Sequence, residues 1–259
     1  MKSERTDDIR KLSMYGFDSV NNGHNIFALL EFDITDLRKA LRDKRIVNEG
    51  GSLFAFLCKA IAKCLYENPL FNSMIDYKKT TNFESVDISI PIEIERNGKT
   101  INKQYLIKNA SEKSIKEITF EINESKNSID DQIGYILAKS MRLIMKIVPG
   151  KIAVLLIRHI MRNHKKVKEL SGTVFITSVS MFSNIPGYII PYIGGPKASS
   201  FAIGSTTKKP VVRNNEIVVR EIINITAVFN HDIIDGAPAA RFINQMRKYI
   251  ESDYMKLIE

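Results

Sequence analysis

Cysteine is nearly missing from this sequence, and tryptophan is missing altogether. Cys58 and Cys64 are the two cysteines among 259 residues, and both fall in one helix-like run. A spacing of six residues on a helix separates them by nearly two turns, which is too far for a disulfide bond. Neither has a metal-ligand partner nearby. We therefore expect no disulfide and no metal site, and we predict that both cysteines are small core residues.

Long apolar runs are missing too. No stretch approaches the ~20 apolar residues of a membrane-spanning helix. The first residues, from Met1 to Asp8, contain no apolar core of the kind that a signal peptide needs, so we expect a cytoplasmic protein. With 44% apolar residues and no repeat, the chain is typical of one soluble globular domain that spans residues 1–259.

Acidic residues are missing from one segment. None occurs between Asp131 and Glu169, where nine lysines and arginines fall, and nine is also the net positive charge of the whole chain. Apolar residues recur at helical spacing on both sides of Pro149-Gly150, so the pattern predicts two short amphipathic helices within residues 134–168. The excess positive charge of this protein therefore belongs to one segment.

Three interpretations of this basic segment stay open. A hairpin that packs on the core with a solvated basic face is favoured, because amphipathicity alone is common in cores. An interfacial helix pair on anionic lipid would instead make the protein peripheral to a membrane. The cations could also contact the phosphates of a nucleotide-bearing cofactor. We expect no nucleic acid partner, because Tyr135 is the only aromatic residue of the segment that could stack on bases.

Strand-like and helix-like patterns alternate along the rest of the chain. Apolar and polar residues alternate over residues 85–94, as in a half-buried strand, and residues 100–107 are predicted to pair with this strand as a hairpin. Helices are predicted from Thr35, from a cap at Ser52 and over residues 111–126. Further strands are predicted at residues 25–33, 172–179, 198–206, 211–219 with a turn at Asn214-Asn215, and 216–229. This order predicts a mixed α/β sandwich.

The most informative stretch is residues 229–236, between a strand-like run and a helix-like run. The run before it is rich in β-branched residues, and the run after it spaces Phe242, Met246 and Ile250 one helical turn apart. His231 and Asp235 are therefore held from both sides by rigid elements, as a catalytic base needs. His231 is also the one histidine of four that has a partner at motif spacing.

The motif His231-x-x-x-Asp235-Gly236 resembles the signature of the catalytic domain of 2-oxo acid dehydrogenase dihydrolipoamide acyltransferases. Other blocks resemble this family in family order, at residues 30–37, 68–76, 107–118 and 172–182. The resemblance implies a chloramphenicol acetyltransferase-like fold, an α+β two-layer sandwich with a mixed sheet and helices on one side. Residues 134–168 would be an insertion, and we find no lipoyl or subunit-binding domain, so a free-standing acyltransferase is expected.

The resemblance also implies the chemistry. His231 would act as the general base of a coenzyme A-dependent acyltransferase, without a covalent acyl-enzyme. Thr177 would hold the oxyanion, with Ser178 as the adjacent alternative, and Asp235 would form a structural ion pair, for which Arg10 is a candidate partner. Gly236 would free the backbone for the turn into the helix. A homotrimer would place the histidine of one subunit opposite the hydroxyl of its neighbour, and coenzyme A is the expected substrate.

Some positions depart from the family pattern. Asp232 occupies a site where many relatives carry arginine, and Val179-Ser180 replaces the usual Leu-Gly. These departures leave open a second interpretation, a non-catalytic scaffold of the same fold that binds a membrane surface or a protein partner. The residues that bind coenzyme A, the acyl group and the acceptor, which could be a thiol, a hydroxyl or an amine, are not specified by the sequence.

Overall fold

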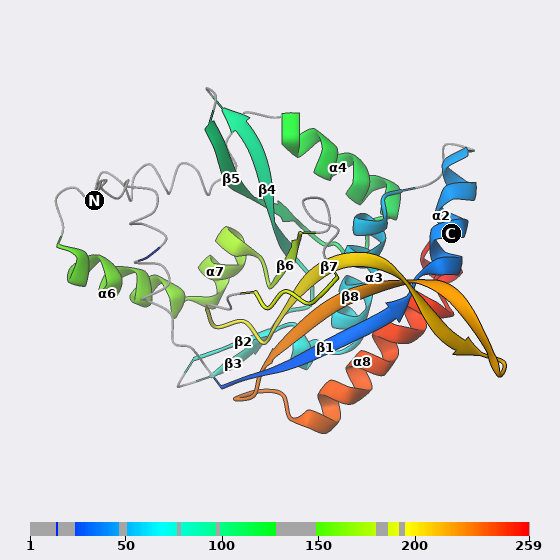
Figure 1. Ribbon diagram of the computed structural model, residues 1–259. Coiled ribbons are helices and arrows are strands. Elements are labelled where there is room, and N and C mark those ends of the chain that lie inside the picture. Colours follow the sequence, from blue (N-terminus) through cyan, green and yellow to red (C-terminus); the bar gives the residue numbers. More distant parts are fainter. Residues whose placement is uncertain are drawn as a thin grey trace, which may run out of the picture.

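Most strands of the described chain belong to one mixed sheet (Figure 1). The structure is a computed structural model that describes Met14 and residues 24–46, 51–76, 79–96, 99–127, 149–179, 186–191 and 195–258. Its strands are β1 (Asn25–Asp33), β2 (Ser73–Ile75), β3 (Thr80–Asn82), β4 (Ile88–Arg96), β5 (Lys99–Ile107), β6 (Val174–Ser178), β7 (Ser199–Arg213) and β8 (Glu216–Asn230). The six-stranded sheet has the order β1-β8-β7-β6-β4-β5, while β2 and β3 pair separately.

The larger helices cover one face of this sheet (Figure 1). The helices are α2 (Thr35–Ile46), α3 (Leu53–Glu67), the short 3-10 helix η1 (Pro69–Phe71), α4 (Ile115–Asn127), α6 (Gly150–Met161), α7 (His164–Ser171), α8 (Gly236–Glu251) and α9 (Met255–Ile258). The core lies between the sheet and α3, α4 and α8. A mixed sheet with helices on one side is what the sequence predicted. None of the helices in the described ranges is long and apolar enough to cross a membrane.

Among the described residues, the opposite face of the sheet carries no helix along β1. Ile26, Ala28 and Leu30 pack against the core, whereas Phe27 and Leu29 on the other face are 51% and 50% exposed. Alternation along a strand explains this difference, because successive side chains point to opposite faces. We call this surface the helix-free face.

Two predicted hairpins are present. β4 and β5 pair from Ile88↔Ile107 to Arg96↔Lys99, and β7 and β8 are joined by a turn in which Asn214 and Asn215 have φ angles of 50° and 63°. Asparagine tolerates this left-handed conformation, which suits a two-residue hairpin turn. β7 is one continuous strand where the sequence predicted a break after residue 206, because residues 207–210 continue the pairing with β8. A bulge lies between Ile203 and Thr206.

Local capping signals set several helix starts. The Ser52 hydroxyl accepts a hydrogen bond from the backbone N of Ala55 at 3.1 Å, as predicted for the start of α3. α4 begins at Ile115 rather than near residue 111, because Ser114 and Glu117 form a reciprocal capping box there. Cys58 and Cys64 are fully buried in α3 and are not bonded to each other, as predicted.

The basic segment is described in its second half only. α6 begins at Gly150 directly after Pro149, where the sequence predicted a break, and α7 follows it. The first predicted helix of the segment, Arg10 and Ser180 lie outside the described residues. Ala153 and Ile157 of α6 are buried, and with only half of the segment described, the three interpretations of the basic segment stay open.

Candidate active site

His231 lies at the point where β8 ends and the chain turns toward α8. Its backbone N donates a hydrogen bond to the carbonyl oxygen of His24 at 2.6 Å, and the Ile234 N donates to the Asn230 carbonyl oxygen at 3.0 Å. The side chain of Ile234 is completely buried. A buried anchor and backbone hydrogen bonds therefore fix the turn, while the His231 ring stays 44% exposed.

An aromatic cluster supports the elements on both sides of this turn. Phe229, two residues before His231, packs edge-on against Phe71 at 5.4 Å and against Phe242 of α8 at 5.7 Å. Phe71 and Phe242 stack at 4.3 Å between ring centroids. Such pairs stabilise a core by more than their area alone. The cluster ties the strand end to the helix, and so holds the histidine turn in place.

The His231 ring faces Asp235, while Arg10, the partner predicted for Asp235, lies outside the described residues. His231 Nδ1 lies 3.6 Å from Asp235 Oδ1, which is ion-pair distance but longer than a hydrogen bond. The Asp235 side chain is 83% exposed, so the residues that the structure describes do not bury it in an ion pair. The prediction that Gly236 is needed to free the backbone for the turn into the helix is wrong in this structure. Its φ is not positive, and a Cβ built there would meet no atom within 4 Å.

His24 is a neighbour of the site that sequence reasoning missed. His24 Nδ1 lies 2.8 Å from Asp232 Oδ1 at the start of β1, and Asn25 pairs with Asn230 across the sheet. The signal was the antiparallel pairing of the first strand with the last, which no local pattern reveals. The departure at Asp232 thus has a contact in this structure, a histidine from the other end of the chain.

Thr177 and Ser178 lie at the end of β6, and the structure separates their orientations. Thr177 pairs with Ala202, Ala202 pairs with Thr226, and Thr226 pairs with Leu29. Residues paired directly across a sheet share a face, so Thr177 lies on the helix-free face with Leu29. Ser178 follows it in the strand and points to the other face. Both side chains are half-buried.

One chain does not bring Thr177 and His231 together. His231 is five residues along β8 from Thr226, which lies two strands away from Thr177. With about 3.3 Å per residue and about 4.8 Å per strand, the two residues are roughly 20 Å apart. The structure therefore unites His231 with Asp235 but leaves Thr177 and Ser178 outside that group.

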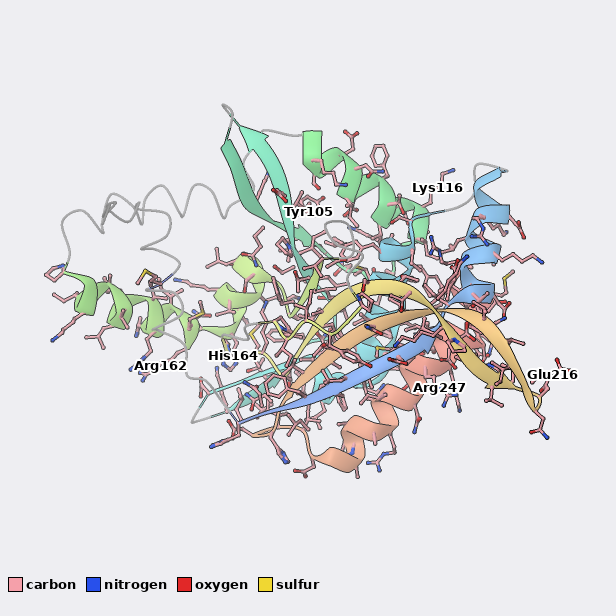
Figure 2. The ribbon with its side chains drawn as sticks, viewed as in Figure 1. Tyr105, Lys116, Arg162, His164, Glu216 and Arg247 are labelled. Atoms are coloured by element: carbon pink, nitrogen blue, oxygen red, sulfur yellow. The ribbon has the colours of Figure 1, made fainter. Side chains whose placement is uncertain are left out.

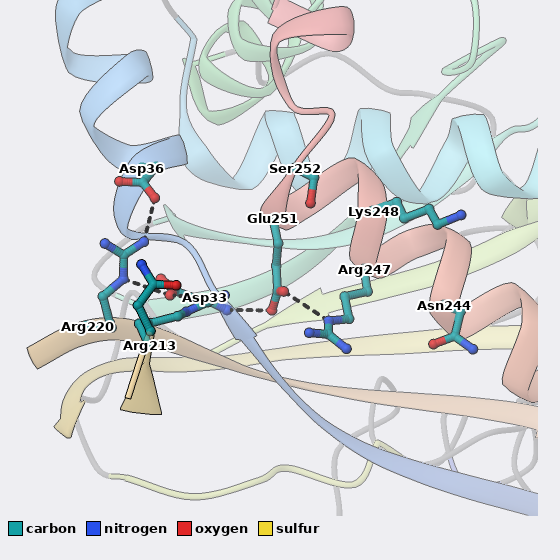
Figure 3. A pocket seen from close by; sticks show the side chains of 10 residues that line it. Asp33, Asp36, Arg213, Arg220, Asn244, Arg247, Lys248, Glu251 and Ser252 are labelled. Carbon is teal, nitrogen blue, oxygen red and sulfur yellow. Dashed lines mark hydrogen bonds and ion pairs between the residues drawn. The ribbon is translucent and has the colours of Figure 1, made fainter. Parts of the chain in front are cut away.

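A polar cavity of about 720 Å³ lies at the far end of β1 from His231 (Figure 3). Asp33 receives hydrogen bonds there from Arg220 Nε at 2.7 Å and Arg213 Nη2 at 3.0 Å, and Arg220 also binds Asp36. Burial alone would raise the pKa of Asp33, but hydrogen bonds from Arg220, Thr35 and Arg213 lower it to about 2. Arg247 pairs with Glu251 in the same cavity. These charges bind one another, so we assign them a structural role.

Metal chemistry has no candidate among the residues that the structure describes. No group of three or more histidine, cysteine, aspartate or glutamate side chains there could hold an ion. His164, the most buried histidine, donates or accepts a hydrogen bond with Thr81 Oγ1 at 2.8 Å, and burial lowers its pKa.

Comparison with known proteins adds to this geometry. The family model described as 2-oxoacid dehydrogenases acyltransferase (catalytic domain) matches residues 25–132 and 151–258. The chain is 27% identical over 232 residues to the lipoamide acyltransferase component of the branched-chain alpha-keto acid dehydrogenase complex of Bacillus subtilis (strain 168), a match that covers 87% of this chain and 46% of that protein. The chain thus spans about half the length of the curated relatives it matches.

Solved structures agree on the fold. A probable dihydrolipoamide acetyltransferase from Listeria monocytogenes 4b F2365 is similar with a TM-score of 0.69 and 24% identity, over 99% of this chain and 98% of that one. A chloramphenicol acetyltransferase is similar with a TM-score of 0.50 and 15% identity, over 97% and 98% of the two chains. These similarities confirm the predicted chloramphenicol acetyltransferase-like fold.

Proposed function

Since this chain belongs to the family of 2-oxoacid dehydrogenase acyltransferase catalytic domains, we propose that it is a coenzyme A-dependent acyltransferase. It would move an acyl group between coenzyme A and a thiol, hydroxyl or amine acceptor. The observation that carries the proposal is the His231 turn. The turn that carries the partly exposed His231 imidazole is held by backbone hydrogen bonds and by the phenylalanine cluster, and one imidazole nitrogen faces a carboxylate.

His231 is the proposed general base. Because Nδ1 faces Asp235, Nε2 is the nitrogen left to take a proton from the acceptor. For a thiol acceptor, the thiolate attacks the thioester carbonyl carbon of acyl-coenzyme A, and the new C–S bond gives a tetrahedral oxyanion. Collapse of this intermediate breaks the C–S bond to coenzyme A, whose thiolate takes the proton back from His231. Imidazole suits both steps because its pKa lies near neutral pH.

Thr177 is the proposed oxyanion donor. Of the two adjacent hydroxyls it is the one on the helix-free face, where a neighbouring subunit can reach it. Since Thr177 and His231 are roughly 20 Å apart within one chain, the site requires His231 from one subunit and Thr177 from the next. A cyclic homotrimer satisfies this, because each of its head-to-tail interfaces pairs the two different surfaces. Exposed Phe27 and Leu29 on the same face support such a contact.

Thiol release from a panel of acyl-coenzyme A donors tests this proposal. We expect turnover of at least one donor, a loss of about a hundredfold or more in His231→Ala, and a loss of about a hundredfold in Thr177→Ala. Ser178→Ala is the matched control and is expected to stay within severalfold of wild type. Circular dichroism would verify that each variant is folded.

The competing scaffold interpretation predicts different results. If no donor is turned over, or if His231→Ala equals wild type, the fold serves binding rather than catalysis. If Ser178→Ala loses more activity than Thr177→Ala, the oxyanion donor is the neighbouring residue and the orientation argument is wrong.

A further inference from the structure

α6 exposes apolar side chains where a helix of a soluble domain usually exposes polar ones. Ile152, Leu155 and Leu156 are 48%, 60% and 48% exposed, and they follow the i, i+3, i+4 spacing of one helix face. The buried side of the helix holds Ala153 and Ile157. Two adjacent faces of α6 are therefore apolar, and only the inner one is covered by the residues that the structure describes. We call the outer set, Ile152, Leu155 and Leu156, the α6 stripe.

Cations border the α6 stripe on one side. Lys151, Arg158 and Arg162 are exposed and recur at helical spacing next to Leu155. Figure 1 shows α6 at the edge of the molecule, far from α2 and α8, and Figure 2 labels Arg162 at its end. The acid-free segment of residues 132–168 contains all of α6.

A basic cavity continues the surface at the joint between α6 and α7. It has a volume of about 440 Å³ and is lined by Lys79, Arg162, Lys165 and His159, among others, and none of the described residues that line it is acidic. His159 is exposed and lies seven residues from Ile152, so it extends the α6 stripe toward this cavity. If the α6 stripe faces the acyl chains of a bilayer, the cations at its end lie at the level of the lipid phosphates.

We propose that α6 docks the protein on an anionic lipid bilayer. The α6 stripe would enter the boundary between headgroups and acyl chains, and Lys151, Arg162, Lys165 and Lys79 would contact lipid phosphates. An apolar face bordered by lysine and arginine is the pattern of helices that lie in a membrane interface. Charge favours lipid over a protein partner, because cations outnumber anions on this surface: Asp76 lies beside the cavity near His164, whereas Lys79, Lys151, Arg162 and Lys165 are all exposed. This docking is independent of the acyltransferase proposal.

Vesicle flotation with the full chain tests the docking. Wild type is expected to float with vesicles of phosphatidylglycerol and phosphatidylcholine, and not with phosphatidylcholine alone. Replacing the α6 stripe by serine (Ile152→Ser, Leu155→Ser, Leu156→Ser) should lower partitioning at least about tenfold. Arg162→Glu with Lys165→Glu should lower it about 25-fold or more, since each cation near an anionic surface contributes about fivefold.

Matched controls lie on α4, at another end of the molecule, where Figure 2 labels Lys116. Phe120 is 65% exposed and Lys116 is exposed, so Phe120→Ser and Lys116→Glu change the same chemistry without touching α6. Both controls should float like wild type.

Four results would overturn the proposal. The first three are no flotation of wild type, equal flotation with both vesicle types, and full flotation of the serine variant. The fourth is release of the protein from vesicles by coenzyme A at matched ionic strength, because this would show that the cations bind the phosphates of a nucleotide. Light scattering on the serine variant adds a fifth. A change of oligomeric mass would show that the α6 stripe covers another subunit instead of lipid.

Discussion

Two aspartates of this chain have opposite surroundings. The Asp235 side chain is 83% exposed beside His231, whereas Asp33 is 8% exposed and receives hydrogen bonds from two arginines and Thr35. A carboxylate in water interacts weakly with a neighbouring charge, and a buried one interacts strongly. Among the described residues, Asp235 therefore orients His231 only loosely, and a second subunit that covers this surface would strengthen the contact.

Asp33 makes a pH-dependent contribution to stability. Its pKa is lowered from 3.8 to about 2, so the contribution is fully present above pH 4 and is lost as the pH falls toward 2. We expect Asp33→Asn to lower the free energy of unfolding at pH 7 by about 2 kcal/mol, and this difference to shrink to about half by pH 3. Urea denaturation of both proteins across this pH range measures it.

Asp36→Asn is the control for Asp33. Asp36 binds the same Arg220, but its side chain is 58% exposed, so its loss should cost less than about 1 kcal/mol. A difference between wild type and Asp33→Asn that does not change between pH 7 and pH 3 would contradict the assigned cause.

At the scale of elements, the junction between α7 and β6 controls the strand that carries Thr177. Gly172 has a φ of 66° and a ψ of −176°, a region that is open almost only to glycine. A Cβ built there would lie 2.4 Å from the Asp87 carbonyl oxygen. This glycine therefore allows β6 to begin close beside the start of β4, where Val174 pairs with Ile88.

Gly172→Ala should lower the free energy of unfolding by about 2–4 kcal/mol, because it adds backbone strain and a clash with main-chain atoms. Gly236→Ala is the matched control at the start of α8. Its Cβ meets nothing within 4 Å, so the change should be neutral or stabilise by up to about 1 kcal/mol. Thermal or urea unfolding separates the two, and equal stability of both variants would contradict the account of this junction.

The sequence predicted most of these elements because their signals are local. The alternation of apolar and polar residues identified β4, and the Asn214-Asn215 pair identified the turn between β7 and β8. The hydroxyl of Ser52 identified the start of α3. The bulge in β7 has no such signal. Gly204 lies within it and close to the main chain of Asn224, where a Cβ would be 3.1 Å from the carbonyl oxygen.

In the candidate site, too, the sequence predicted the contact between neighbouring residues and missed the contacts between distant ones. His231 and Asp235 are four residues apart on one turn, so a motif could place them together. His24 and the Phe71 ring reach the turn from distant parts of the chain, and the Asp33–Arg220 pair joins β1 to β8. Contacts between residues this far apart in sequence depend on strand pairing and packing, which a local pattern does not encode.

At the scale of the whole molecule, the helix-free face is the surface that a trimer would bury. Phe27→Ser with Leu29→Ser should therefore dissociate the oligomer, with a rise of about tenfold or more in its dissociation constant, because apolar anchors dominate interface cores. Phe120→Ser, on the helix-covered side, is the control. Sedimentation equilibrium measures the masses, and an unchanged mass for the double variant would remove this face from the interface.

Activity of mixed oligomers tests the central claim most directly, namely that a site takes His231 from one subunit and Thr177 from the next. His231→Ala and Thr177→Ala should each be nearly inactive alone. When the two are co-assembled in equal amounts, about one quarter of the sites in a cyclic trimer receive both native residues, so about a quarter of wild-type activity should return. A mixture as inactive as its two components would contradict the shared site and the account built on it.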